Sequence, residues 1–434
     1  MRHLKTLGLR CTQIVAGSLI LTALMASTGL AQSGSAEGVT LRFATTEDPT
    51  AMQPVIDAFV AANPGVTIIH ESIPFDDFNN VLQARIGQGD STPDVFTADM
   101  PAVSALVQRG FLMDLTDAVG DISSMHMPAS MEAVTVNDRI YALPVSTSTM
   151  VMYYNADLLE AAGIELPGRM PDDRLTWGQV VEMGQQAQQS GARWGLLWDQ
   201  VSRIYQHQTL PESLGGGSGI NPENELSLAI TNDAWVEAFE FYAEAFESGL
   251  SPRGVPGPGQ TAELFAAGEV AFFAGGPWWV PRLFASKADL NFSFTPYPYF
   301  EGGVPVTPTG SWAWGINPNT EHMEVALDFL RFASLTEEGA LAAASRQPIP
   351  PANVEALQTY INQPLFQSEN LLGIGDLMAY ELAETARIRP RTIGWIQYES
   401  IINRSIEDMR NGAPVRQALE GAAAEIEAAW SRLQ

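Results

Sequence analysis

The sequence has few of the residues on which much enzyme and metal chemistry depends. It contains one cysteine and five histidines among 434 residues. Cys11 lies in an N-terminal segment that we expect to be removed, so the mature chain would have no thiol for a disulfide, a thiolate metal site or a nucleophile. The histidines show no metal-ligand spacing, and the Gly-x-Ser-x-Gly motif of serine hydrolases does not occur. We therefore expect no metal, no cofactor and no catalytic residue.

Positive charge is also scarce. Lys and Arg together number 23 against 50 Asp and Glu, which gives a formal net charge of −27. An acidic surface repels the phosphate backbone of nucleic acids, so we expect no nucleic-acid partner. With 46% apolar residues the chain can bury a large core, and its length favours two domains.

The first 31 residues have the pattern of a secretory signal peptide. A basic start precedes an apolar run at residues 14–25, and the small residues Gly29 and Ala31 fit a cleavage site. The apolar run is too short for a membrane-spanning helix, and no second run follows. The single cysteine is not at the cleavage point, so we expect no lipid anchor. These features predict a periplasmic protein, with residues 32–38 as a flexible mature N-terminus.

Alternating apolar patterns near the start of the mature chain predict strands and helices in turn. A strand at Val39–Thr45 is followed by a helix with apolar residues between Met52 and Val60. A second strand, Val66–His70, precedes a helix that runs from Phe75 to Ile86, and a third strand covers Pro93–Thr97. Three successive β-then-α units predict a parallel sheet with helices on both faces.

The segment Gly268–Arg282 combines a strand, a turn and two adjacent indoles. Its short apolar run, Val270–Ala274, is typical of a strand buried on both faces. Two glycines then allow a tight turn, and the proline after them suits the first position of a helix. Trp278 and Trp279 follow, and neighbouring helical side chains point about 100° apart. We therefore expect one indole, with a preference for Trp278, to face a crevice at the carboxyl end of a strand, where ligands bind in open α/β sheets.

Several later segments have clear local patterns. Thr176 and Gln179 have the spacing of a helix capping box. A helix that carries Trp235 and Tyr242 on one face is expected to pack in the core, and residues 310–317 read as a strand of the first lobe. The small polar run Val145–Ser148 is suited to a pliant passage between lobes.

Together these landmarks resemble the extracellular solute-binding proteins of carbohydrate ABC transporters, the class of maltose-binding protein. The resemblance covers nearly the whole mature chain and depends on the order and spacing of the motifs. Its motifs are Pro93-Asp94-Val95, Tyr154-Asn155-Ala156-Asp157-Leu158 with Ala161-Ala162-Gly163, Thr176-Trp177, Phe265 to Ala271, Gly276-Pro277-Trp278, Pro296 and Gly310-Ser311-Trp312.

The resemblance implies a fold and a division of the chain. The fold is a two-lobed α/β periplasmic-binding-protein fold of type II, in which each lobe is a sheet flanked by helices and the chain crosses three times. The expected N-terminal lobe comprises residues 39–145 and 297–335. The expected C-terminal lobe comprises residues 149–292 and 346–434. Hinges are expected near residues 145–149, 292–297 and 335–346.

The resemblance also implies ligand-binding positions where the motifs align. In the first lobe and the first hinge these are Glu47, Asp48, Asp99, Ser148 and Trp312. Ser148 stands where maltose-binding protein has a carboxylate, which counts against maltose. In the second lobe the implied positions are Trp198, Asp199, Gly276, Trp278, Trp279, Arg391 and Trp395.

These residue types suit a sugar. The C–H faces of a sugar ring stack on aromatic rings, and its hydroxyls hydrogen-bond to charged or planar groups. A competing interpretation treats the carboxylates as ordinary solvated surface and Arg387, Arg389 and Arg391 as an exposed basic edge. The resemblance implies a monomeric, non-catalytic protein that closes on a sugar or polyol and delivers it to ABC permease subunits in the inner membrane. The alternatives are the same fold with another solute (a glycerol phosphate ester, a polyamine or ferric ion) and an exported polysaccharide-degrading enzyme.

Overall fold

The computed structural model describes residues 38–254, 257–286, 290–346 and 349–433. The expected signal peptide, residues 1–31, and residues 32–37 of the expected N-terminus lie outside the described residues. All described residues belong to one structural unit. Among them, no helix combines the length and the hydropathy that a membrane span requires.

The first sheet has five strands in the order β2-β1-β3-β14-β6. Their bounds are Val39–Thr45 (β1), Val66–Ser72 (β2), Val95–Asp99 (β3), Leu143–Thr147 (β6) and Ser311–Ile316 (β14). Strands β2 and β3 run parallel to β1, as the β-then-α units predict. Strand β14 runs antiparallel to β3, and β6 runs antiparallel to β14, so the sheet as a whole is mixed.

Helices cover both faces of this sheet. Their bounds are Pro49–Ala62 (α1), Phe75–Arg85 (α2), Val103–Gln108 (α3), Thr116–Val119 (α4), Pro128–Val134 (α5), Met323–Leu335 (α13) and Glu337–Ala344 (α14). Leu41 and Phe43 of β1 pack with α1 and α13. Ala44, on the opposite face of the strand, packs with α2 and α3. The alternation of side chains along β1 thus divides the core into two layers, as period-2 geometry requires.

The second sheet has four strands in the order β12-β7-β11-β8. Their bounds are Val151–Asn155 (β7), Trp194–Trp198 (β8), Val270–Gly275 (β11) and Phe292–Thr295 (β12). Strand β11 pairs parallel to β8 and antiparallel to β7. Every residue of β11 is buried, which confirms the buried strand predicted over Val270–Ala274.

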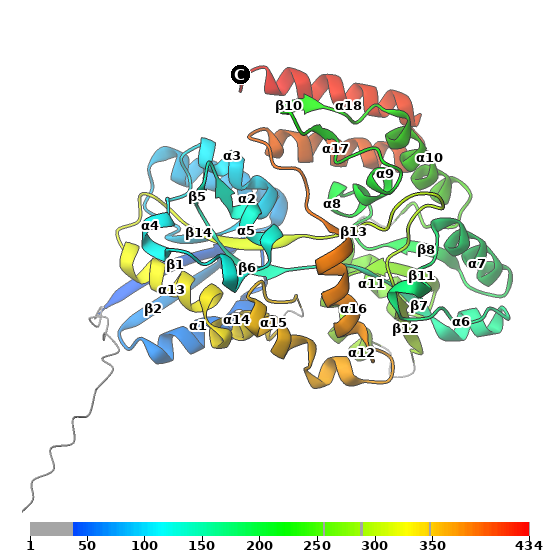
Figure 1. Ribbon diagram of the computed structural model, residues 1–434, viewed down its shortest axis with the longest axis horizontal. Coiled ribbons are helices and arrows are strands. Elements are labelled where there is room, and N and C mark those ends of the chain that lie inside the picture. Colours follow the sequence, from blue (N-terminus) through cyan, green and yellow to red (C-terminus); the bar gives the residue numbers. More distant parts are fainter. Residues whose placement is uncertain (1–37, 255–256, 287–289, 347–348, 434) are drawn as a thin grey trace, which may run out of the picture. The chain divides into compact units, whose positions relative to one another are not determined.

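Helices also flank the second sheet (Figure 1). Their bounds are Ala156–Ala161 (α6), Trp177–Gln189 (α7), Ile204–His207 (α8), Thr209–Ser213 (α9), Asp233–Glu247 (α10), Pro258–Ala266 (α11), Val280–Ser286 (α12), Val354–Ile361 (α15), Ile374–Tyr380 (α16), Trp395–Arg410 (α17) and Val415–Trp430 (α18). The capping box at Thr176 is present. Trp235 and Tyr242 lie on the buried face of α10, so both of these predictions are confirmed.

The chain passes from the first sheet to the second between β6 and β7 and returns between β12 and β14. Strand β6 extends through Val145–Thr147, the first three residues of the run expected to be pliant. The short strands Thr307–Pro308 (β13) and Ala386–Arg387 (β15) pair beside these passages. The expected lobe and hinge boundaries remain predictions.

Candidate functional site

A cavity of about 230 Å³ is lined by residues of the first sheet and by residues of segments that follow strands of the second sheet. Four aromatic side chains contribute to its lining: Phe75, Tyr205, Trp278 and Trp312. Five charged side chains also contribute: Glu47, Asp99, Arg203, Arg389 and Glu399. The cavity therefore presents both apolar ring faces and charged hydrogen-bonding groups.

Trp278 reaches this cavity from the turn after β11. It belongs to the short 3₁₀ helix Pro277–Trp279 (η5), which has its proline in the first turn. Trp279 instead packs against the hydrophobic core beside the second sheet, with the guanidinium of Arg282 5.9 Å from its ring. The two adjacent indoles thus lie in different surroundings, and Trp278 is the one that lines the cavity.

Gly276 makes room for this indole. A Cβ atom at Gly276 would lie 2.1 Å from the ring of Trp278, far inside contact distance. Its backbone φ of −95° is open to any residue. The glycine is therefore required by the close approach of the indole and not by the tight turn that the sequence suggested.

Asp199 anchors the same indole from the protein interior. Its carboxylate is fully buried, and Oδ2 accepts hydrogen bonds from the indole N–H of Trp278 at 3.1 Å and from the amide of Gln200 at 3.2 Å. Burial raises the pKa of Asp199 to about 7, although these hydrogen bonds favour the ionised form and limit the rise. Asp199 orients Trp278 and does not itself line the cavity.

The first sheet supplies the facing side of the cavity. Trp312 of β14 pairs with Asp99, the last residue of β3. Its ring lies 6.1 Å from that of Phe75 at an angle of 80°. Glu47 follows β1 and also lines the cavity. Asp48 does not: its exposed carboxylate accepts a hydrogen bond from the backbone N–H of Thr50 at 2.8 Å and caps α1. Asp48 therefore acts as the N-cap of α1 and not as a lining residue of the cavity.

Arg389 joins elements of the two sheets through carboxylates. Its two Nη atoms donate to the two carboxylate oxygens of Asp99 at 2.8 and 2.5 Å, and Nη1 donates to Glu399 at 3.3 Å. Asp99 ends β3 of the first sheet, whereas Glu399 lies on α17. The guanidinium also lies 5.2 Å from the ring of Tyr205 and 5.5 Å from that of Trp395.

Arg389 is only 7% exposed, which makes the interpretation of an exposed basic edge wrong for this residue. Burial opposes its charge, but the two carboxylates outweigh burial and raise the pKa of Arg389. Burial also raises the pKa of Glu399, with Asp99 acting in the same direction and Arg389 against it. Asp99 lines the cavity, but both of its carboxylate oxygens already accept hydrogen bonds from Arg389.

Two further contacts bring the sheets together at the cavity. The hydroxyl of Ser148 donates to the carbonyl of Gly310 at 2.7 Å and lies 3.1 Å from the hydroxyl of Tyr205. The guanidinium carbon of Arg203 lies 4.2 Å from the centre of the Phe75 ring. This is a cation–π contact between the loop after β8 and the start of α2.

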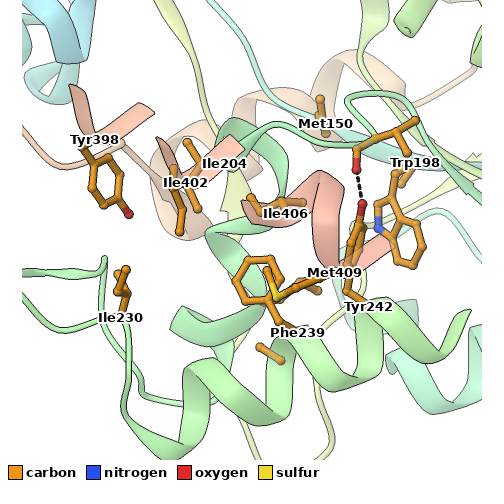
Figure 2. Packing of buried hydrophobic residues seen from close by; sticks show 14 of the residues in the cluster. Met150, Trp198, Ile204, Ile230, Phe239, Tyr242, Tyr398, Ile402, Ile406 and Met409 are labelled. Atoms are coloured by element: carbon orange, nitrogen blue, oxygen red, sulfur yellow. Dashed lines mark hydrogen bonds between the residues drawn. The ribbon is translucent and has the colours of Figure 1, made fainter. Parts of the chain in front are cut away.

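Two of the expected indoles lie elsewhere. Trp198 is fully buried, with ring centres of Tyr242 and Phe246 at 5.6 and 5.8 Å, and Figure 2 shows it beside Tyr242 in the core. Trp395 is also fully buried and packs 5.4 Å from Tyr398. Neither indole lines the cavity, because their surroundings are filled by other aromatic side chains.

Arg391 also lies outside the cavity. Its Nη2 donates to the carboxylate of Glu132 at 2.8 Å, and its Nη1 donates to the carbonyl of Thr135 at 3.1 Å. Both partners belong to the first-sheet side of the molecule, so Arg391 forms a second link of the same kind as Arg389, with more exposure to solvent.

Several lining residues were not anticipated from the sequence, among them Phe75, Arg203, Tyr205, Arg389 and Glu399. Phe75 comes three residues after the end of β2, and Arg203 and Tyr205 follow β8. The rule that strand ends face the ligand, applied to every strand, would have selected these three. Arg389 and Glu399 follow no such long strand, and only the tertiary structure brings them to the cavity.

The class of protein follows from comparison with known sequences. The family model described as bacterial extracellular solute-binding protein matches residues 55–369, which is more than half of the chain. The chain therefore belongs to the bacterial extracellular solute-binding protein family.

Individual relatives agree with this family. The maltodextrin-binding protein MdxE of Bacillus subtilis is 26% identical over 327 residues, which is 73% of each chain. An arabinooligosaccharide-binding protein of Halalkalibacterium halodurans is 23% identical over 63% of this chain, and the match spans 61% of that relative's length. The ABC substrate-binding protein Lmo0181 of Listeria monocytogenes, solved in complex with cycloalternan, superimposes with a TM-score of 0.77 at 21% identity and covers 91% of this chain and 98% of its own. This likeness shows the two-lobed fold.

Proposed function

We propose that this protein captures a carbohydrate in the cavity between the two sheets and delivers it unaltered to the permease of an ABC importer. The observation that carries the proposal is the pairing of two indoles, Trp278 and Trp312, with charged side chains around one cavity. Indole faces stack on the C–H faces of a sugar ring. Charged side chains such as Glu47 and Arg203 are suited to its hydroxyls.

The relatives support the same ligand class. MdxE is named for maltodextrin binding, and the relative from Halalkalibacterium halodurans is named for arabinooligosaccharide binding. These names belong to binding proteins, so we infer that the present chain is a non-catalytic binding protein. We further propose that it acts as a monomer. Cleavage after residue 31 without lipid attachment would release it into the periplasm, as the N-terminal sequence pattern predicts.

The mechanism we propose is closure of the two lobes about hinges near residues 145–149, 292–297 and 335–346. A ligand that contacts both lobes stabilises the closed arrangement by contacts that the open arrangement lacks. Asp99 and Trp278 come from opposite sides of the cavity. One bound sugar that reaches both would therefore bias the equilibrium toward closure.

Two of the other solutes fit the cavity less well. A phosphate ester favours clustered, unneutralised arginines, but of the two arginines that line the cavity Arg389 is paired with two carboxylates and Arg203 lies over the ring of Phe75. Ferric ion favours paired tyrosinates, but Tyr153 and Tyr154 are buried within β7. Burial moreover raises the pKa of Tyr153 far above its usual value, which disfavours the ionised form.

A thermal-shift screen of the mature protein against monosaccharides, disaccharides, trisaccharides and polyols tests the proposal. A bound sugar at 100 times its Kd should add about 2.7 kcal/mol of stability, and calorimetry should then give the affinity. Chromatography of the incubated sugars should show no product. Release of shorter sugars would instead support the polysaccharide-degrading enzyme, and the absence of any binding in the panel would refute carbohydrate capture.

A further inference from the structure

Arg389 lies at the boundary of the sugar cavity with a second, larger space. We call this space the outer groove: it has a volume of about 1200 Å³, and its lining includes Glu132, Asn137, Ser218, Glu225 and Arg391. Arg389 lines both the cavity and the outer groove. Its side chain therefore stands between the two.

The space beside Arg389, between the cavity and the outer groove, is too small for a sugar. A small cavity of about 10 Å³ shares Gly310 and Arg389 with the main cavity, and it shares Ile388 and Arg391 with the outer groove. One water molecule needs about 10–15 Å³ of such space. A sugar ring cannot pass through it while Arg389 keeps its position.

Arg389 is also held firmly in that position. It donates three hydrogen bonds to the carboxylates of Asp99 and Glu399, and its guanidinium lies near the rings of Tyr205 and Trp395. We call Arg389 with these two carboxylates the Arg389 barrier. Swinging the guanidinium aside would remove the cation that both carboxylates share, at a large desolvation cost.

We propose that the Arg389 barrier closes one end of the binding cleft and thereby limits the carbohydrate to a short chain. This inference rests on the proposed function, because it concerns the length of the ligand that the cavity takes. The cavity of about 230 Å³ is smaller than the roughly 300–1,000 Å³ of typical ligand pockets. Without the barrier, the cavity would continue into the outer groove and a longer oligosaccharide would fit.

Calorimetry with saccharides of increasing length tests the proposal on the full mature chain. The probes are maltose, maltotriose, maltotetraose and maltohexaose, together with arabino- and galacto-oligosaccharides of matching lengths. We expect the wild-type protein to bind the longest member of a series at least about tenfold more weakly than its best short member, a loss within the usual range of steric discrimination.

A neutral triple variant removes the barrier without leaving a buried charge. In Asp99→Asn/Arg389→Ala/Glu399→Gln, we expect the penalty for the longest saccharide to shrink to less than about threefold. A companion variant with Arg389→Met in place of Arg389→Ala keeps most of the side-chain volume and should keep the penalty. Exposed Arg387 lies two residues away, and Arg387→Ala should leave the length profile as in the wild type.

The outcomes separate the two hypotheses. If the wild-type protein binds the longest saccharide as tightly as the short ones, the length limit is refuted and carbohydrate capture stands. If no saccharide in any series binds, both are refuted. Should the triple variants fail to fold in a circular-dichroism melt, the wild-type length profile still decides for or against the inference.

Discussion

The indole of Trp278 is the side chain on which ligand affinity should depend most. It lines the cavity and is fixed by a hydrogen bond to Asp199. We expect Trp278→Ala to lower affinity about tenfold or more, which corresponds to losing one good aromatic stacking contact and its apolar area. Calorimetry with the best ligand of the screen measures this. Trp279→Phe is the matched control, because Trp279 is partly buried against the core and does not line the cavity, so the change should alter stability but not affinity. Unchanged affinity in Trp278→Ala would refute the assignment.

Asp199 should make stability depend on pH. Its pKa in the folded protein is about 7, above its usual 3.8, because it is buried. The folded state therefore keeps a proton that the unfolded state releases, and the resulting stability is fully present below about pH 4 and is lost as pH rises toward 7. Asp199→Asn cannot titrate, so its stability should fall less than that of the wild type across this interval.

Urea unfolding at several pH values between 4.5 and 7.5 tests this prediction. The comparison must be between proteins, because buried His207, whose pKa burial lowers to about 4, acts in the opposite direction in both. Asp172→Asn, at an exposed carboxylate, is the control and should follow the wild-type curve. Parallel curves for Asp199→Asn and the wild type would contradict the assignment.

At the residue scale, the sequence could tell for some aromatic side chains, but not for others, whether they line the cavity or pack in the core. Trp278 follows a buried strand, so its position at a strand end was readable from the pattern. Trp198 is the last residue within β8, where its direction depends on which face of the sheet the strand buries. Arg389 looked like an exposed basic residue, because nothing local indicated that Asp99, 290 positions away, would pair with it in the interior.

At the scale of elements, the turn between β11 and η5 sets the position of the stacking indole. A methyl group at Gly276 would lie 2.1 Å from the ring of Trp278, so the ring must move. We expect Gly276→Ala to lower affinity about tenfold, as Trp278→Ala does, because the displaced indole no longer stacks. The same calorimetric titration measures it.

Gly421 provides the matched control for this prediction. It lies within α18, and a methyl group there would meet open space. Gly421→Ala should leave affinity unchanged and raise helix stability by about 0.5–1 kcal/mol. A Gly276→Ala protein with wild-type affinity would show that the turn tolerates a side chain without moving the indole.

Local patterns predicted the bounds of several helices and strands well, but they predicted the direction of only some strands. Strand β1 has the predicted bounds, and the helices α1, α2 and α10 lie where their apolar spacing indicates. Strand direction was predictable for β1 to β3, because each is linked to the next by a helix. The antiparallel neighbour β14 arrives from more than two hundred residues later in the chain, and periodicity carries no information about the direction of such a strand.

At the scale of the whole described unit, the two sheets meet through polar and aromatic contacts around the cavity. Asp99 pairs with Arg389, and Phe75 lies under the guanidinium of Arg203. If the lobes open as proposed, these contacts exist only in the closed arrangement. They therefore contribute to the closure equilibrium and, through it, to the apparent affinity for the ligand.

The contact between Phe75 and Arg203 offers a direct test of this coupling. A cation–π pair contributes about 0.5–2 kcal/mol, depending on its desolvation. We expect Phe75→Leu, which keeps an apolar side chain at the cavity, to weaken binding about two- to fivefold. The loss should appear as faster dissociation with a nearly unchanged association rate, because the contact forms after the ligand has entered.

Stopped-flow binding to Phe75→Leu, Arg203→Gln and the double variant measures this coupling as a double-mutant cycle. The control is Phe284→Leu, because Phe284 is an exposed aromatic residue of α12 outside the cavity. If the two single changes simply add, the pair does not act as one contact. If the change falls on the association rate instead, the pair shapes the entrance of the open protein and not its closed arrangement. Coupling confined to dissociation would place the energy of this contact in the step by which the two lobes hold the ligand.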